Sequence, residues 1–103
     1  MRQGVRLPPF YHLIELTLMG SSPQRLTETA KRFVTRLRPL VRRRRVTLLG
    51  PVPHRLYRLR RTYRMCVMLK GRRVEPMVEL LRSVLQSGRK FGDLPVIIDV
   101  DPL

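Results

Sequence analysis

The sequence has few of the residues that disulfides and metal sites need. Its 103 residues include one cysteine, Cys66, and two histidines, His12 and His54. A single cysteine excludes an internal disulfide, and the histidines have no partners at zinc-ligand spacing, so we expect no metal and no other cofactor. The lack of structural disulfides fits a reducing cytoplasm.

Long apolar runs are missing as well. No run approaches the roughly 20 residues of a membrane-spanning helix. The N-terminal segment MRQGVRLPPF has charge but neither the apolar stretch nor the cleavage site of an export signal. The sequence therefore predicts a cytoplasmic protein without membrane contact.

Catalytic motifs are absent too. There is no G-x-x-x-x-G-K-[ST] phosphate loop and no cysteine cluster. Asp99 and Asp101 are two residues apart on an expected strand, so they could mimic an acid/base pair. A proline follows them and no other acid is near in sequence, which favours a role in ending the strand or in pairing with a local arginine. We therefore predict that the chain is not an enzyme.

Positive charge is what the sequence has in excess. The net charge is +15, from 22 Lys and Arg against 7 Asp and Glu, and nineteen of the 22 are Arg. Between Thr29 and Val74 there are sixteen basic residues and no acidic one. The planar guanidinium fork suits phosphates and carboxylates, although an arginine-rich composition also arises in GC-rich genomes. The charge predicts a surface that binds a polyanion.

Hydrophobic periodicity predicts six elements in the order strand, helix, strand, strand, helix, strand. Ser22 is the expected N-cap of the first helix, which Pro39 should end or kink. Residues 50–61 are expected to form a proline-punctuated linker, residues 1–9 an extended lead-in, and Gly88 the C-cap of the second helix. The expected strands are residues 10–19, 46–49, 62–70 and 94–100. The first helix is expected to begin at residue 23 and the second near residue 73 or 74.

The simplest packing of these elements is one α+β domain, residues 1–103. It is a two-layer β-α-β-β-α-β sandwich of ferredoxin-like type, with two helices on one face of a four-stranded sheet. The other face would be bare. It should carry several apolar side chains and serve either as a docking surface or as a face that simply contacts water. These side chains are Tyr11, Leu13, Cys66, Met68 and Ile97.

Two arginine-rich segments are the candidate nucleic-acid site. The run at residues 42–45 has more adjacent charge than the capping of a helix end requires, although a solvated helix end is the simpler alternative. In the linker, Tyr57 lies among arginines and could stack on unpaired bases, whereas Tyr63 falls on the core face of its strand. The candidate residues are Arg42, Arg43, Arg44, Arg45, Arg55, Tyr57, Arg58, Arg60, Arg61 and Arg64.

Three segments together resemble a known family. They are R-x-G-x-x-LPPF at residues 2–10, LLGPVP at residues 48–53 followed by Tyr63-Arg64, and IDVDP at residues 98–102. In this order and spacing they resemble the C-terminal domain of the primosomal helicase PriA family (primosomal protein N′). The chain departs from the family at Met65, where a tryptophan is usual, and in its heavier basic run at residues 42–45.

The resemblance implies an S10-like fold and a nucleoid-associated role in replication restart. Such a domain helps to hold branched or single-stranded DNA and the acidic C-terminal tail of single-stranded DNA-binding protein. The family's tail-binding arginine corresponds to Arg73, or to Arg72 if the alignment shifts by one residue. The helicase lobes of PriA, which are absent from this chain, would be a further partner.

The first hypothesis is therefore a non-catalytic DNA- and protein-binding module. A structural RNA-binding protein of S10 type is the alternative, because its charge and fold would be similar. The chain could be a solitary protein, a remnant or a piece of a longer chain.

Overall fold

The computed structural model describes residues 11–86 and 89–101. The expected lead-in at residues 1–9, the expected C-cap Gly88 and the end of the IDVDP segment at Pro102 lie outside the described residues. Of the helices in the described part, neither has the length and apolarity needed to cross a bilayer. The elements in order are β1 (His12–Gly20), α1 (Pro23–Arg44), β2 (Thr47–Leu59), β3 (Thr62–Gly71), α2 (Val74–Val84), β4 (Lys90–Phe91) and β5 (Leu94–Val100).

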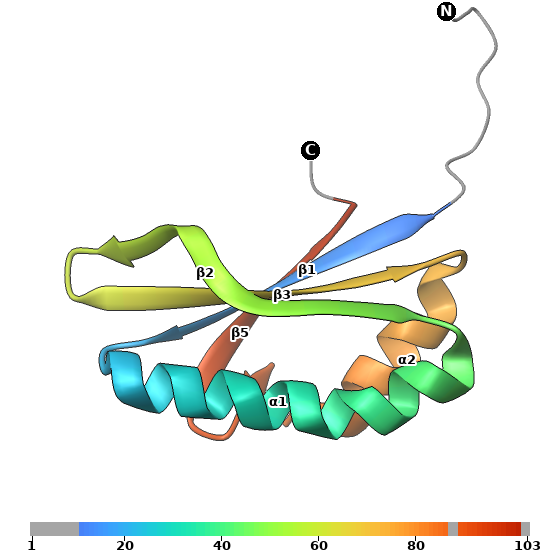
Figure 1. Ribbon diagram of the computed structural model, residues 1–103, viewed down its shortest axis with the longest axis horizontal. Helices are drawn as coiled ribbons and strands as arrows, with labels where there is room; N and C mark the ends of the chain where they lie inside the picture. Colours follow the sequence, from blue (N-terminus) through green and yellow to red (C-terminus); the bar gives the residue numbers. More distant parts are fainter. Residues whose placement is uncertain (1–10, 87–88, 102–103) are drawn as a thin grey trace, which may run out of the picture.

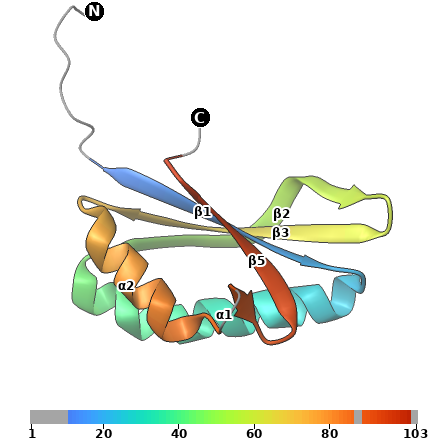
Figure 2. The same ribbon diagram turned by 180° about the vertical axis from the view of Figure 1, so that it is seen from behind.

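The five strands form one antiparallel sheet in the order β2-β3-β1-β5-β4. Both helices lie on the same face of this sheet (Figures 1 and 2). The α+β class is confirmed, but the expected count of four strands is wrong. The fifth strand, β4, has two residues and pairs with the start of β5 across Gly92, whose φ is +61°. A strand of two residues is too short to show any alternation in the sequence.

The core lies between the sheet and the helices, where the periodicity predicts it. Ile14, Leu16 and Leu18 of β1 are 0% exposed. They share this core with Val67 and Leu69 of β3 and with an apolar stripe of α1 that recurs at helical spacing. The stripe consists of Leu26, Ala30, Phe33, Val34 and Leu37. Val100 of β5 is an exception, because the alternation predicts it in the core and it is 44% exposed. On the bare face Cys66 is also an exception, because it is buried there beside Glu15.

Helix α1 begins as predicted but does not end at Pro39. The Ser22 side chain accepts a hydrogen bond from the Arg25 N–H at 3.3 Å, and Pro23 is the first helical residue. The helix then continues through Pro39 to Arg44. An interior proline costs about 3 kcal/mol, whereas burying Val41 beyond it contributes about 1.5–3 kcal/mol. The partly buried Leu40 adds to this gain, so packing offsets the proline.

Strand β2 is the largest departure from the sequence-based expectation. The expected short strand and linker form one strand of 13 residues, which pairs with β3 up to a turn at Arg60-Arg61. Register shifts between Leu49 and Val52 and between Pro53 and Arg58 take up the irregular segments. β2 is at the edge of the sheet, so no further strand pairs with its outer side. A proline, which has no N–H, therefore removes no hydrogen bond on that side. The prolines therefore bend the strand without ending it.

Gly50 explains how β2 passes so close to β3. Its φ is +101°, and a Cβ at this position would lie 2.8 Å from the Cys66 carbonyl oxygen. Only glycine adopts this conformation without strain or a backbone clash. The bend at Gly50 sets the course of the rest of the strand, and with it the position of the arginines beyond.

Candidate nucleic-acid interface

The end of the β2–β3 hairpin is a strongly basic surface. We define the hairpin tip as residues 52–64. In it Arg55, Arg58, Arg60 and Arg61 are exposed, and neither β2 nor β3 carries an acidic residue. Arg60 has a φ of 58° at the turn. The guanidinium groups of these residues are thus free of competing carboxylates on their own strands.

Exposed apolar side chains lie among these arginines. Val52 is 51%, Leu56 53% and Leu59 46% exposed. Isolated apolar residues are common on protein surfaces, but three on one short hairpin beside four arginines form a mixed surface. Such a surface can contact both the phosphates and the bases or sugars of an unpaired strand. Sequence reasoning missed these residues because it assigned the segment to a linker.

Tyr57 is on β2, so the expected linker position is wrong. Its ring lies 5.4 Å from that of Tyr63, with 61° between the ring planes, and it packs partly against the core. The Arg58 guanidinium carbon lies 5.6 Å from the centre of the Tyr63 ring. The two tyrosines therefore brace the hairpin, and a base can reach Tyr57 only through the part of its ring that remains accessible.

Arg64 differs from the arginines of the turn. It is half-buried on β3, opposite Met19 of β1. Its Nη1 is buried and has no hydrogen-bond partner among the described residues. A buried donor without a partner is costly, so Arg64 is the arginine of the tip that would gain most from an anion that reached it.

The basic run at residues 42–45 occupies the end of α1. Arg42, Arg43 and Arg44 form the last turn, where cations interact favourably with the helix dipole. Arg45 is the C-cap, with a left-handed φ of 55°, and its N–H donates to the Val41 carbonyl. The helix-end alternative thus accounts for the position of these residues. It does not account for what Arg44 and Arg45 face.

Arg44 and Arg45 face the junction between β3 and α2. Together with Arg72 and Arg73 they line a groove of about 500 Å³, which we call the arginine groove. The sequence assigned these two pairs to different partners, but the structure brings them together. The other lining residues are Tyr11, Val46, Thr47 and Pro76.

Carboxylates do little to neutralise the arginine groove. Arg73 Nε lies 3.8 Å from Glu75 Oε1, with both side chains largely exposed, which is a weak contact. Arg73 is also the N-cap of α2, and its side chain makes no capping hydrogen bond. The positive end of α2 therefore adds to the charge of the groove.

The hairpin tip and the arginine groove lie at opposite ends of the molecule (Figure 1). Thr47, the first residue of β2, lines the groove, and Leu59, the last, is at the tip. Twelve steps along a strand span at most about 40 Å. The two basic sites are thus too far apart to hold one phosphate but suitably placed for two different ligands or two arms of one ligand.

The remaining candidates have structural roles. Asp101 Oδ1 accepts the Leu13 N–H at 2.9 Å, and His12 Nδ1 lies 2.9 Å from Asp101 Oδ2. These hydrogen bonds, first that of His12 and then that of Leu13, hold the pKa of Asp101 below its ordinary value. Asp101 therefore fastens the end of β5 to β1, as the strand-ending interpretation expected, but with a histidine in place of an arginine. His54 Nδ1 accepts the Leu56 N–H at 3.0 Å.

Cys66 is a buried free thiol. Burial raises its pKa to about 12, with further contributions from the negative charge of Glu15 and the hydrogen bond that its thiol donates to Glu15. The neighbouring cations do not reverse this effect. No thiolate chemistry is therefore available near neutral pH.

Comparisons with known proteins agree on one family. A family model described as the primosomal protein N C-terminal domain matches residues 3–103. A curated relative, "Replication restart protein PriA" of Thermotoga maritima, is 31% identical over 101 residues, which are 98% of this chain and 12% of the relative. Among solved structures, the de novo designed protein Foldit4 has a TM-score of 0.66 at 11% identity, covering 90% of this chain and 98% of that one. The designed protein shares the fold alone.

Proposed function

Because the chain belongs to the family of primosomal protein N C-terminal domains, we propose that it is a non-catalytic DNA- and protein-binding module that acts in replication restart. It covers 12% of the PriA relative, so helicase activity would belong to other parts of such a protein. The helicase lobes of PriA would then be a partner of these 103 residues, in a nucleoid-associated complex. The S10-like fold implied by the resemblance fits this role.

The observation that carries the proposal is the hairpin tip. Its four exposed arginines lie among exposed apolar side chains and have no acidic neighbour on either strand. Arginine forks bind phosphates, and apolar or aromatic faces accept bases that are not paired. Single-stranded DNA or the branch of a fork offers both, so this is the DNA class that the tip fits.

The arginine groove is the proposed site for an acidic protein tail, such as that of single-stranded DNA-binding protein. Arg72 and Arg73 would bind carboxylates, with Arg44 and Arg45 on the opposite wall. Val46 and Pro76 supply an apolar surface in the same groove for a hydrophobic residue of the peptide. Arg42 and Arg43 are exposed beside the groove and would remain available to DNA.

A salt titration tests the DNA site. For single strands, each phosphate that the protein neutralises adds about 0.7 to the slope of log affinity against log salt. The triple replacement of Arg58, Arg60 and Arg61 by Ala should therefore lower the slope by about 2. The matched control replaces Arg32, Arg36 and Arg38 of α1, which removes equal charge from the exposed side of a helix.

Three nucleic acids separate the possible outcomes: forked DNA, single-stranded DNA and structured RNA. Loss of DNA binding in the tip variant, with the control unchanged, supports the proposal. Equal losses in both variants would mean that net charge alone drives binding. Preference for structured RNA would instead favour the S10-like RNA-binding alternative.

A peptide titration tests the arginine groove. An acidic peptide with a free C-terminal carboxylate should bind about tenfold more weakly to Arg73→Ala, because hydrogen bonds to charged groups contribute about 1.5–3 kcal/mol. Arg36→Ala is the control of equal charge. If amidation of the peptide and Arg73→Ala both leave the affinity unchanged, the assignment of this groove is wrong.

A further inference from the structure

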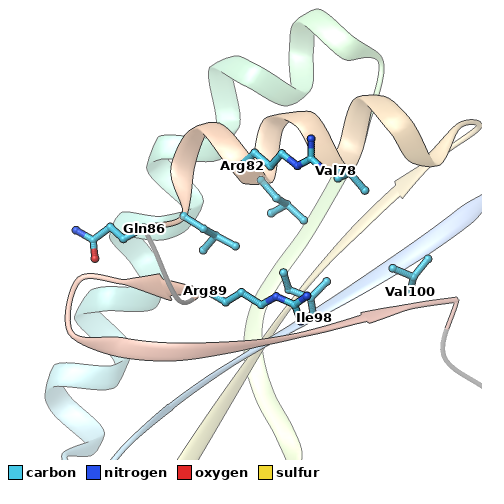
Figure 3. Close-up of a pocket in the computed structure, with 8 residues that line it drawn as sticks. Val78, Arg82, Gln86, Arg89, Ile98 and Val100 are labelled. Carbon is cyan, nitrogen blue, oxygen red and sulfur yellow. The ribbon is translucent and has the colours of Figure 1, made fainter.

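A second groove lies at the other end of α2, between this helix and β5. Val78 and Leu81 of α2 and its C-cap Leu85 form one wall, and Ile98 and Val100 of β5 form the other, around a volume of about 500 Å³ (Figure 3). Arg82, Gln86 and Arg89 supply the polar part of the lining. We call this the edge groove. It shares no residue with the arginine groove.

The wall formed by β5 has a backbone edge that no other described residue pairs with beyond Val96. β4 pairs with β5 only at Leu94 and Pro95, and one more hydrogen bond joins the Val96 N–H to the Arg89 carbonyl at 2.9 Å. Backbone groups of an antiparallel strand point alternately to its two neighbours. The Val96 N–H points away from β1, and the Asp101 N–H donates to the Leu13 carbonyl of β1. By this alternation, the backbone N–H and C=O groups of Ile98 and Val100 point away from β1, like those of Val96.

The two edges of this sheet are protected to different degrees. Natural edge strands are usually guarded by prolines, bulges or charges. β2 has all three: Pro51, Pro53, two register shifts and several arginines. From Ile98 to Val100, β5 has no proline and no register shift in its pairing with β1, and its one charge, on Asp99, lies on the face away from the groove. The outer edge of β5 is therefore the one suited to accept another strand.

The charges of the edge groove select the occupant. The described part of the chain offers neither Arg82 nor Arg89 an ion-pair partner. Figure 3 shows Arg89 extending between α2 and β5 and Arg82 lying along α2. The lining has no acidic residue. Of the nearby acids, Asp99 is on the alternate side of β5, and Asp101 is bound to His12 and Leu13. A second copy of this chain would bring another +15 charge.

From these observations we propose that the edge groove binds an extended acidic segment of a partner protein. The segment adds as an antiparallel strand to β5 at Ile98 and Val100. Every second side chain of the segment faces the groove. The central ones are apolar and pack against Ile98 and Val100, and the outer ones are acidic and pair with Arg82 and Arg89. This is recognition by β-strand addition, in which the main chain supplies affinity and the groove supplies specificity. The proposal does not depend on Arg72, Arg73 or a free carboxyl terminus.

The test uses the 103-residue chain and the heptapeptide Glu-Thr-Val-Thr-Val-Thr-Glu, acetylated and amidated so that it has no terminal carboxylate. Its Val and Glu side chains share the face that meets the groove, and its Thr side chains lie on the other face. In antiparallel pairing, the Val residues that face the groove also direct their N–H groups to β5. A peptide N-methylated at its Val residues should bind about tenfold more weakly, because it loses hydrogen bonds of about 1 kcal/mol each. The matched control is N-methylated at two Thr residues, whose N–H groups point away from β5, and its affinity should be nearly unchanged.

A protein variant provides a second reading. Arg82→Glu should weaken binding of the heptapeptide about tenfold, while Arg36→Glu, at another exposed position on α1, should change it little. Equal binding of the two methylated peptides would overturn the proposal, as would no saturable binding up to about 1 mM. A third outcome would assign the edge of β5 to a second copy of the chain instead. In that case the chain would self-associate, the Val-methylated peptide would not block the association, and Arg82→Glu would strengthen it.

Discussion

Gly50 provides the sharpest test of how the hairpin is built. Replacing it with Ala adds one methyl group, but the methyl carbon would lie 2.8 Å from the Cys66 carbonyl oxygen, which is backbone and cannot turn away. The φ of +101° adds a second cost, because an L-residue rarely adopts it. Strained backbone conformations cost about 1–3 kcal/mol, and overpacking costs a similar 1–3 kcal/mol.

Together these terms predict that Gly50→Ala lowers the free energy of unfolding by about 3 kcal/mol. For a chain of this size the midpoint of thermal unfolding should fall by about 10–20 °C. The assay is urea and thermal denaturation followed by circular dichroism. Since the bend at Gly50 directs the rest of β2, single-stranded DNA affinity of the folded variant should also fall.

Gly71→Ala is the matched control on the neighbouring strand. There the added methyl carbon would meet the Met77 sulfur at 3.3 Å, which is the movable part of a flexible side chain, and no positive φ is involved. Its cost should stay near or below 1 kcal/mol. If Gly50→Ala is destabilised no more than Gly71→Ala, the close approach of β2 to β3 at Gly50 is wrong.

Three further predictions concern single residues. Pro39→Ala restores a helical N–H at an exposed position of α1 and should stabilise the chain by about 1–3 kcal/mol, so an unchanged urea midpoint would contradict the account of α1. The pKa of Asp101 is lowered from 3.8, so its contribution to stability is present above that pH and disappears as the pH falls through the lower pKa of the folded state. The difference in unfolding free energy between wild type and Asp101→Asn should therefore shrink on acidification. A constant difference from about pH 6 to about pH 3 would refute the pairing. Because the pKa of Cys66 is raised to about 12, a thiol reagent at pH 8 should react slowly with the native chain and rapidly in urea, and equal rates would show that Cys66 is accessible.

The parts of the fold that the sequence predicts are those with repeated burial. Ile14, Leu16 and Leu18 alternate, and the stripe of α1 recurs at helical spacing, because each residue faces the same core. The errors are where tertiary context overrides a local signal. Pro39 ends a helix only if nothing beyond it is buried, and the prolines of β2 end a strand only if it is not at an edge. Neither condition can be read from neighbouring residues.

The candidate site was predictable in composition but not in arrangement. The arginines of the hairpin tip are evident as a charge run, yet their distance from the run at the end of α1 depends on the full length of β2. Arg45 and Arg72 are far apart in sequence and meet because α1 ends beside the junction of β3 and α2. Arg82 and Arg89 gave no signal at all, since their significance depends on how little of β5 is covered by β4.

The fastening of Asp101 to β1 has a mechanical consequence. The Leu13 carbonyl accepts the Asp101 N–H, and the Asp101 side chain accepts the Leu13 N–H. The start of β1 and the end of β5 are therefore paired side by side, and the described chain enters and leaves the sheet at the same place. A load applied to both ends would not shear the sheet as a whole. It would open the β1–β5 ladder one hydrogen bond at a time, beginning with the His12–Asp101 contact. If flanking domains pull on this one, that pair of strands is where it should yield first, and acid should weaken that point further.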